Sequence, residues 1–498
     1  MKYIEIIRKF DLKLSVIILL AAVLRFYNYQ DRWALAYDQA WFALVARHAL
    51  NTFQIPLLGP FASGGPFQTG GEWFWVVMAG TLWTPTLVIA PWIFITFLSV
   101  VQVYLMYLLG KEILNKNFGL LVSLLTAVST SQTLQATNLT NQTTISLWST
   151  LLIWSIIKYL KDHKLKYLLL AGFAVGFASS LHFQGVLLLP VIIIFIIFGK
   201  VFSVKKMFLV FLGILIPWLP VLYVDAQNNF YNTLSILSYF SSNQSQASYD
   251  VLGRRWLTFI TQYIPLAWAR IIGGISVIGY IEIFLLSFFA LINLRIRKIT
   301  TEWYVIAASV FTITILLRYI RAPLFENYIT FLHPFIFLLT GWMILQIFRV
   351  KKIAAGILTL TICVLSIYET VSEVKGSTNM ASGEAKKIAK VLKDRYPNEK
   401  LAIYDYDYLN AGHSVPVVLY LETDGKIDDG GRKIGYSVKN DQTIKALSMH
   451  PVIYGKDGEV QLFDLNSSKS SELTKNKWKS ITTKSIYDSV QNWFRIKR

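Results

Sequence analysis

Cysteine is almost missing from this chain of 498 residues, and charged side chains are scarce. Cys363 is the only cysteine and lies in an apolar run, so an intrachain disulfide is excluded, and this residue alone can form neither a CxxC motif nor a zinc site. Charged residues make up 15% of the chain and hydrophobic residues 54%, with a mean hydropathy of +0.48. This balance is too apolar for a soluble domain and predicts a multi-span membrane protein.

Acidic residues are the scarcer charged type. There are 29 Asp and Glu against 48 Lys and Arg, which gives a net charge of +19. A basic surplus can indicate nucleic-acid binding, but much of this charge lies in short runs between apolar segments, as is typical of cytoplasmic loops. We therefore expect the charge to reflect membrane topology, and we expect no nucleic-acid partner.

Apolar segments long enough to cross a bilayer recur along the chain. Basic runs at the N-terminus and at 158–166, 200–206, 295–298 and 349–352 are expected inside, so that 30–71, 225–270 and everything after 370 face outside. No small-residue cleavage site follows Arg25-Phe26-Tyr27, so we expect the first span to be retained. The clear spans are 12–29, 88–110, 143–160, 167–183, 185–200, 207–224, 271–293, 303–320, 327–347 and 353–369.

The stretch 72–160 must hold an odd number of crossings, because it joins an outer loop to an inner one. It shows four apolar pieces, so one must be split or fail to cross, and we predict 11 or 13 transmembrane helices in total. The two weaker pieces are 72–86 and 118–135. Polar runs at 129–133 and 138–142 indicate short or broken helices, which are tolerated at membrane depth where they line a cavity.

The composition becomes polar after about residue 370, and no further span follows. Residues 384–396 are predicted to form an amphipathic helix, and 400–404, 451–454 and 460–463 short strands. No glycine-rich phosphate loop occurs there. The sequence thus predicts an all-α polytopic membrane domain over 1–370 and a soluble extracytoplasmic α/β domain over 371–498.

The first outer loop contains the most informative acid, Asp38. Apolar residues recur at helical spacing from Tyr37 to Leu50, which predicts an interfacial helix with Asp38 in its first turn. An acid there complements the helix dipole, so Asp38 is either a helix-start residue or a functional group. A glycine-rich stretch, 59–71, leads to Glu72, a second outer acid that could assist Asp38 or hold a cation.

Histidines and arginines near the outer face are further candidates. His182 lies at an outer turn and His333 within an apolar segment, where a lone histidine is more often a packing residue than a ligand. The outer arginines Arg270, Arg318 and Arg321 run against the positive-inside trend. They could bind a lipid phosphate bidentately or only anchor the protein at the headgroups.

The order of these parts resembles the GT-C-class glycosyltransferases, in particular the branch of protein O-mannosyltransferases and lipid A aminoarabinose transferases. The resemblance covers about 10–370. Tyr37-Asp38-Gln39-Ala40-Trp41 is similar to an Asp-Glu-then-aromatic element, 181–190 to a Lys-Gly, Leu-rich, Pro segment, and 325–335 to an Arg/His-Tyr…Pro segment. Gln39, Gln184 and Asn327 depart from the second acid, the lysine and the basic residue that are common at these places.

This resemblance implies inverting transfer of a sugar from a polyprenyl-phosphate donor to an acceptor hydroxyl on a protein, glycan or lipid, at the outer membrane face. Asp38 would be the general base. No metal would be required, because guanidinium groups can neutralise a monophosphate, although a divalent cation bridging Asp38 and Glu72 is compatible with the chemistry. The expected substrate-binding residues are Tyr37, Gln39, Trp41, Glu72, His182, Gln184, Arg270, Arg318, Arg321, Glu326, Tyr328 and His333.

A different class of function is a transporter or flippase of lipid-linked saccharides, in which Asp38 would couple transport to a proton or cation. Transporters usually place such groups at the bilayer midplane and contain inverted repeats. Here the acids lie at one face and no repeat is visible, which favours the enzyme.

Overall fold

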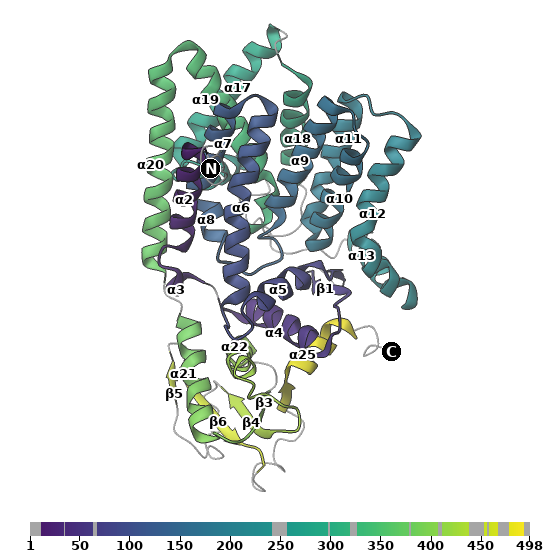
Figure 1. The fold of residues 1–498 in the computed structure, drawn as a ribbon, viewed down its shortest axis with the longest axis vertical. Helices are drawn as coiled ribbons and strands as arrows, with labels where there is room; N and C mark the ends of the chain where they lie inside the picture. The colour runs from purple at the N-terminus through teal and green to yellow at the C-terminus, as the bar shows by residue number, and fades with distance from the viewer. Residues whose placement is uncertain are drawn as a thin grey trace, which may run out of the picture.

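The computed structural model describes residues 11–33, 35–62, 67–241, 256–296, 299–318, 326–377, 380–406, 411–437, 453–455, 458–466 and 478–492. A bundle of helices forms one end of the elongated molecule, and a small sheet with its own helices forms the other (Figure 1).

Long apolar helices build the bundle. Among the described residues, five segments are long and apolar enough to cross a membrane: α6 (Ala90–Ile113), α12 (Val204–Gln227), α17 (Ser276–Arg295), the segment Asn327–Val350 and α20 (Lys352–Gly376). The fourth of these joins most of η3 (Glu326–Leu332) to α19 (His333–Val350). Further bundle helices are α2 (Leu12–Phe26), α7 (Lys116–Val128), α9 (Ile145–Asp162), α10 (Lys166–Leu181), η1 (Phe183–Leu188), α11 (Leu189–Phe198) and α18 (Thr301–Leu317). The predicted multi-pass membrane fold is confirmed, while the total of 11 or 13 spans stays a prediction.

The two weak pieces of 72–160 both depart from a simple span. Residues 72–86 form α5 (Glu72–Trp83), which is too short to cross a bilayer. It lies with α4 (Tyr37–Thr52) across the end of the bundle that faces the sheet (Figure 1). The second piece breaks after α7 into the short α8 (Thr130–Gln135) and an irregular stretch up to residue 144. The broken helix expected from the polar runs is therefore confirmed.

Two buried arginines hold the backbone at this break. Arg25 donates to the carbonyls of Thr126 (3.2 Å) and Ala127 (3.0 Å) at the end of α7. Arg32 donates to Arg25 O at 2.9 Å and also to Thr133 O in α8. Carbonyls at a helix end have no partner within the helix, so these guanidinium groups supply the missing donors. The break is thereby fixed directly ahead of the polar residues 138–142.

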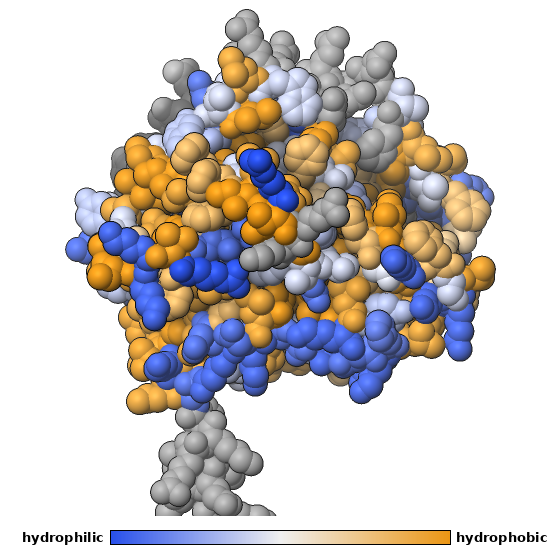
Figure 2. Space-filling model, turned by 90° about the horizontal axis from the view of Figure 1, so that it is seen from above, coloured by the Kyte–Doolittle hydropathy of each residue, from blue (hydrophilic) through white to orange (hydrophobic). Residues whose placement is uncertain are grey.

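The loops at the bundle end far from the sheet contain the basic runs 158–166, 200–206 and 349–352. Figure 2 views the molecule from this end and shows hydrophilic side chains gathered along one edge, between broad hydrophobic surfaces. Such a distribution is typical of one membrane face of a multi-span protein.

The remaining elements near the sheet-facing end of the bundle are short. They are α3 (Tyr29–Arg32), the hairpin β1 (Leu58–Phe61) and β2 (Gln68–Gly70), α13 (Tyr231–Ser241), α15 (Trp256–Thr258), the π-helical η2 (Phe259–Tyr263) and α16 (Ile264–Ile271).

The C-terminal part is a mixed α/β domain. Its sheet has the order β5-β6-β4-β3-β7, in which β3 and β4 are parallel and the other pairs are antiparallel. The predicted helix 384–396 and the strands 400–404 and 460–463 are confirmed. Of the predicted strand 451–454, residues 453–454 lie in β5, whereas 451–452 fall outside the described residues. The elements are α21 (Met380–Arg395), β3 (Leu401–Tyr406), α22 (Ala411–Thr423), β4 (Arg432–Ser437), β5 (Ile453–Gly455), β6 (Gly458–Asp464), β7 (Trp478–Ile481) and α25 (Thr483–Gln491).

Candidate active site

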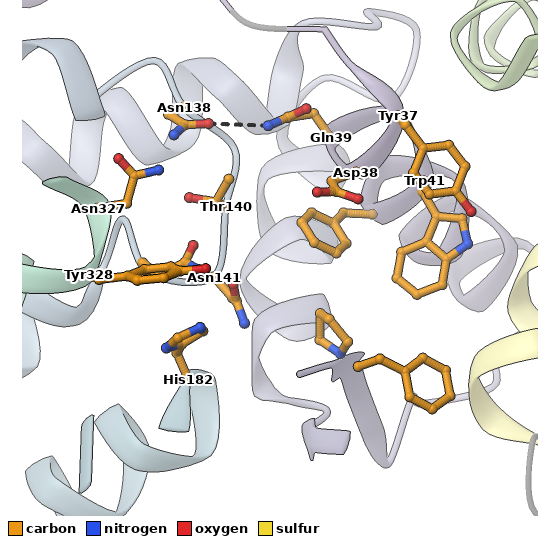
Figure 3. A pocket seen from close by; sticks show the side chains of 14 residues that line it. Tyr37, Asp38, Gln39, Trp41, Asn138, Thr140, Asn141, His182, Asn327 and Tyr328 are labelled. Atoms are coloured by element: carbon orange, nitrogen blue, oxygen red, sulfur yellow. Dashed lines mark hydrogen bonds between the residues drawn. The ribbon is translucent and has the colours of Figure 1, made fainter. Parts of the chain in front are cut away.

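A cavity of about 450 Å³ opens beside the first turn of α4. Its walls come from segments far apart in the sequence, namely the start of α4, strand β1, the irregular loop after α8, the α10–η1 turn and η3 (Figure 3). The lining residues are Tyr37, Asp38, Gln39, Trp41, Phe42, Pro60, Phe61, Asn138, Thr140, Asn141, Gln142, His182, Asn327 and Tyr328. Six residues expected to form the site from the sequence are thus brought together: Tyr37, Asp38, Gln39, Trp41, His182 and Tyr328.

The first turn of α4 directs Asp38 into this cavity. The Gln39 side chain accepts a hydrogen bond from Ala36 N (3.2 Å), which caps the helix start, and donates to Asn138 Oδ1 (3.2 Å). This second bond ties the helix to the opposite wall and is drawn as a dashed line in Figure 3. The predicted helix and the place of Asp38 in its first turn are confirmed. Its location at the membrane interface stays a prediction.

The Asp38 carboxylate has no hydrogen bond or ion pair with any described residue. Its oxygens are reachable through the cavity, yet the protein atoms around them replace much of the surrounding water. This desolvation raises the pKa of Asp38 above its ordinary value. A carboxylate with unused lone pairs and a raised pKa is suited to accept a proton from a bound group.

Neutral amides form the wall opposite Asp38. Asn138 donates to Gln135 Oε1 (3.2 Å), and Gln135 in turn donates to Asn327 Oδ1. Asn141 donates to Leu181 O at 2.7 Å, which fixes the loop against α10. Asn138, Thr140, Asn141 and Gln142 were not among the site residues expected from the sequence. Their signal was the polar run 138–142 in an otherwise apolar chain.

His182 and Tyr328 lie side by side at the far wall, with ring centroids 5.4 Å apart. His182 Nδ1 accepts a hydrogen bond from Gln184 N at 3.3 Å, so the proton of a neutral ring resides on Nε2. Burial lowers the pKa of His182 to about 4, and the ring is therefore neutral at pH 7. It can offer an Nε2–H donor to a ligand without adding charge.

Glu72 and Gln184, both expected at the site, lie behind the cavity wall instead of lining it. Glu72 is fully buried and accepts a hydrogen bond from Ser180 Oγ through Oε2, while Oε1 has no partner among the described residues. Burial raises the pKa of Glu72 to about 7. This acid joins the start of α5 to the end of α10, close beneath the hairpin.

The expected basic residues do not line the cavity where they are described. Arg270 pairs with Glu369 (3.3 Å) and Glu373, and the Arg318 guanidinium lies 5.8 Å from the Trp256 ring centroid. Arg321 falls outside the described residues, as does the Glu326 side chain.

His333 is also away from the cavity, fully buried, with Nδ1 2.5 Å from Gln132 Nε2.

The donor set of the cavity bears on cation binding. Asp38 is the one carboxylate among the lining residues, and the described residues contain no group of three or more His, Cys, Asp or Glu able to hold a metal. A cation bridging Asp38 and Glu72 would need both carboxylates in the cavity, but Glu72 is not among the described residues that line it.

The C-terminal domain contacts the hairpin that contributes Pro60 and Phe61 to the cavity. Gln491, the last residue of α25, accepts hydrogen bonds from Leu57 N (3.0 Å) and Leu58 N (3.1 Å) and donates to Leu58 O (2.7 Å). Gln68 in β2 is fully buried and donates to Val490 O at 2.9 Å. One wall of the cavity thus depends on residues from the end of the chain.

The structure has an apolar multi-helix bundle, a helix with an acid in its opening turn, and a cavity between that helix and broken segments. These are features expected from the resemblance to the GT-C class of membrane glycosyltransferases. Residues 75–224 match the family described as dolichyl-phosphate-mannose-protein mannosyltransferase. A search of curated protein sequences gives no match.

Solved structures of this class share the fold. One is ArnT from Cupriavidus metallidurans bound to undecaprenyl phosphate, with 11% identity, 90% of this chain and 97% of that chain covered, and a TM-score of 0.57. Another is the Archaeoglobus fulgidus oligosaccharyltransferase in complex with Zn and sulfate, with 10% identity and a TM-score of 0.52. The match covers 96% of this chain and 76% of that chain. The resemblance inferred from the sequence is confirmed, and the chain shares the fold of these membrane glycosyltransferases.

Proposed function

We propose that this protein transfers a sugar from a polyprenyl-phosphate donor to an acceptor hydroxyl, with inversion at the anomeric carbon and Asp38 as the general base. The acceptor is a hydroxyl of a protein, glycan or lipid. The reaction takes place at the extracytoplasmic face, with the N-terminus in the cytoplasm and the C-terminal domain outside. The observation that supports this proposal best is the unpaired Asp38 carboxylate, which faces a cavity of about 450 Å³ with a raised pKa.

The reaction is a single displacement. Asp38 takes the proton of the acceptor hydroxyl as its oxygen attacks the anomeric carbon, and the bond from that carbon to the donor phosphate oxygen breaks. The electron pair leaves with the polyprenyl phosphate, so the new glycosidic bond forms on the opposite face of the sugar. A partly desolvated carboxylate that has no competing hydrogen bond with a described residue is matched to this step.

The other walls supply binding and orientation. Asn138, Asn141 and Asn327 offer amide groups for sugar hydroxyls, while the Tyr328 ring gives a flat face for a sugar ring. The His182 Nε2–H is a neutral donor for the leaving phosphate oxygen. Neutral donors stabilise the charge that develops on the leaving phosphate less than a guanidinium does. A cation beyond the described wall would therefore favour departure of the phosphate.

Loss of Asp38 provides the direct test. Cells carrying wild type, Asp38→Asn or no protein are compared by mass spectrometry of cell-envelope glycans, which detects a missing sugar whatever its identity. We expect Asp38→Asn to lose the same sugar as the null cells, because removal of a general base slows a step by about 10²- to 10⁴-fold. Asp31→Asn, which alters another exposed acid close in sequence, is the matched control and should retain the sugar. Full glycan in Asp38→Asn cells at equal protein abundance would refute the role of Asp38.

Purified protein distinguishes the enzyme from a flippase of lipid-linked saccharides. Given the donor and an acceptor in detergent micelles, where no membrane gradient exists, an enzyme moves the sugar to the acceptor hydroxyl and releases free polyprenyl phosphate, whereas a flippase leaves the donor intact. The product's anomeric configuration, measured by NMR, tests inversion.

A further inference from the structure

A second and larger cavity, of about 710 Å³, lies on the side of the bundle away from the active site. One face of α20, one face of α7 and three residues of α19 line it, together with Leu20 and Asn115. The α20 residues are Lys352, Ala355, Gly356, Thr359, Leu360, Cys363 and Ile367, the α7 residues are Asn117, Phe118, Leu121, Leu124 and Val128, and the α19 residues are Ile344, Leu345 and Phe348. We name this feature the α7–α20 groove. α20 stands at the edge of the bundle (Figure 1), and Leu360, which lines the groove, is 65% exposed, so the groove opens on the outer surface of the bundle.

The spacing of the lining residues shows that the α7–α20 groove runs along the helix axes. Residues 352, 355, 359, 363 and 367 of α20 repeat every three or four positions and therefore share one face. At a rise of 1.5 Å per residue, this face extends for about 22 Å, and the α7 face from 117 to 128 for about 16 Å. Half of a bilayer's hydrocarbon core is about 15 Å thick, so the groove matches one acyl chain in one leaflet.

Polar groups gather at only one end of the groove. Lys352 lies there, with its ammonium 5.7 Å from the Phe348 ring centroid and no carboxylate partner among the described residues. Asn115 and Asn117 lie at the N-terminus of α7, and their side-chain NH₂ groups have no partner in the described part of the chain. Lys116 between them is neutralised by Asp11 at 3.1 Å. No acidic residue lines the groove.

We propose that the α7–α20 groove binds an anionic phospholipid of the leaflet on the lysine-rich side. One acyl chain lies between α7 and α20, and the headgroup phosphate sits at Lys352, Asn115 and Asn117. The cation, the two amide donors and the positive end of the α7 dipole all favour an anion at this end. The apolar remainder of the groove favours hydrocarbon. The proposal is independent of the sugar-transfer reaction.

Photocrosslinking with two phospholipids tests the occupant. Protein is reconstituted in nanodiscs of phosphatidylcholine. Each sample contains a trace of one probe lipid, either phosphatidylglycerol or phosphatidylcholine, and both probes have the same diazirine-bearing acyl chain. Adducts are then mapped by peptide mass spectrometry. We expect the phosphatidylglycerol probe to label the peptide around Cys363, the chain's only cysteine, about fivefold more than the phosphatidylcholine probe. Lys352→Ala should remove this preference.

Filling the groove is the second arm. A Cβ at Gly356 would have no atom within 4 Å, so Gly356→Trp fits on the helix and occupies the groove, with Thr359→Trp as a second filling variant. Ile357→Trp is the matched control, because Ile357 lies on the same helix, is 61% exposed and does not line the groove. We expect the filling variants to lose the adduct and the control to keep it.

Three results would overturn the proposal. Equal labelling by both probes in wild type would mean ordinary surrounding lipid. Loss of the adduct in Ile357→Trp to the same extent as in Gly356→Trp would mean a nonspecific effect. Stronger displacement of the probe by undecaprenyl phosphate than by phosphatidylglycerol would mean a prenyl carrier as the occupant.

Discussion

Glu72 provides the sharpest quantitative prediction, because it is a fully buried acid whose only hydrogen-bond partner among the described residues is the Ser180 hydroxyl. Its pKa rises from the usual 4.5 to about 7, a difference that corresponds to about 3 kcal/mol of preference for the protonated form in the folded protein. The folded state therefore binds a proton that the unfolded chain releases above about pH 4.5. Glu72 contributes its full stability below that pH and loses the contribution as the pH rises through 7.

Replacement by glutamine isolates this effect. Gln cannot ionise, so Glu72→Gln should match wild type near pH 4.5 and should be more stable than wild type at pH 8, by about 3 kcal/mol. Thermal unfolding of purified protein in detergent at pH 5 and pH 8 measures the difference between the two proteins at each pH. Glu302→Gln, at the first turn of α18, controls for loss of a negative charge. Parallel pH dependence of Glu72→Gln and wild type would refute the reasoning, because it would show that Glu72 is already charged in the folded protein.

Four further predictions concern the site. The kcat/KM of wild type should rise with pH through a midpoint above the usual pKa of an aspartate near 3.9, and the residual activity of Asp38→Asn should lack this rise. Gln491→Ala removes three hydrogen bonds to the β1 segment, so it should lower kcat/KM. Gln491→Glu keeps the two bonds that the side chain accepts from backbone N–H groups, so it should recover part of the lost kcat/KM. Enzyme assays of both variants test this. Gly70→Ala should destabilise the protein in thermal unfolding, since its Cβ would lie 2.0 Å from Glu72 Oε2. Addition of EDTA should leave the rate of sugar transfer unchanged if the neutral amides and His182 of the cavity suffice for the phosphate without a metal ion.

Much of the bundle could be predicted from the sequence, because a bilayer demands long apolar helices and composition alone reveals them. The first turn of α4 was also predictable, since the apolar repeat from Tyr37 fixed both the helix and the place of Asp38. The predicted break after residue 128 followed from polar residues that a spanning helix cannot expose to lipid.

The rest of the site depended on contacts that spacing does not encode. Nothing local in the sequence indicates that Asn138 bonds to Gln39, 99 positions earlier. Arg270 looked like a phosphate ligand because it was expected on the outer side, but Glu369 and Glu373, 99 and 103 positions later in the sequence, neutralise it. His333 shared an apolar segment with Tyr328, yet only Tyr328 lines the cavity, because η3 gives way to α19 between them.

The bond between Gln491 and Leu58 also bears on how the protein is made, because it joins residues 433 positions apart. A ribosome releases the hairpin long before α25, so the β1 strand has no such side-chain partner until α25 has been made. Until the C-terminal domain has folded against the hairpin, the wall that holds Pro60 and Phe61 is incomplete. A chain that lacks α25 would therefore have an incomplete cavity wall, so the shape of this cavity depends on a residue made 433 positions after the strand that it supports.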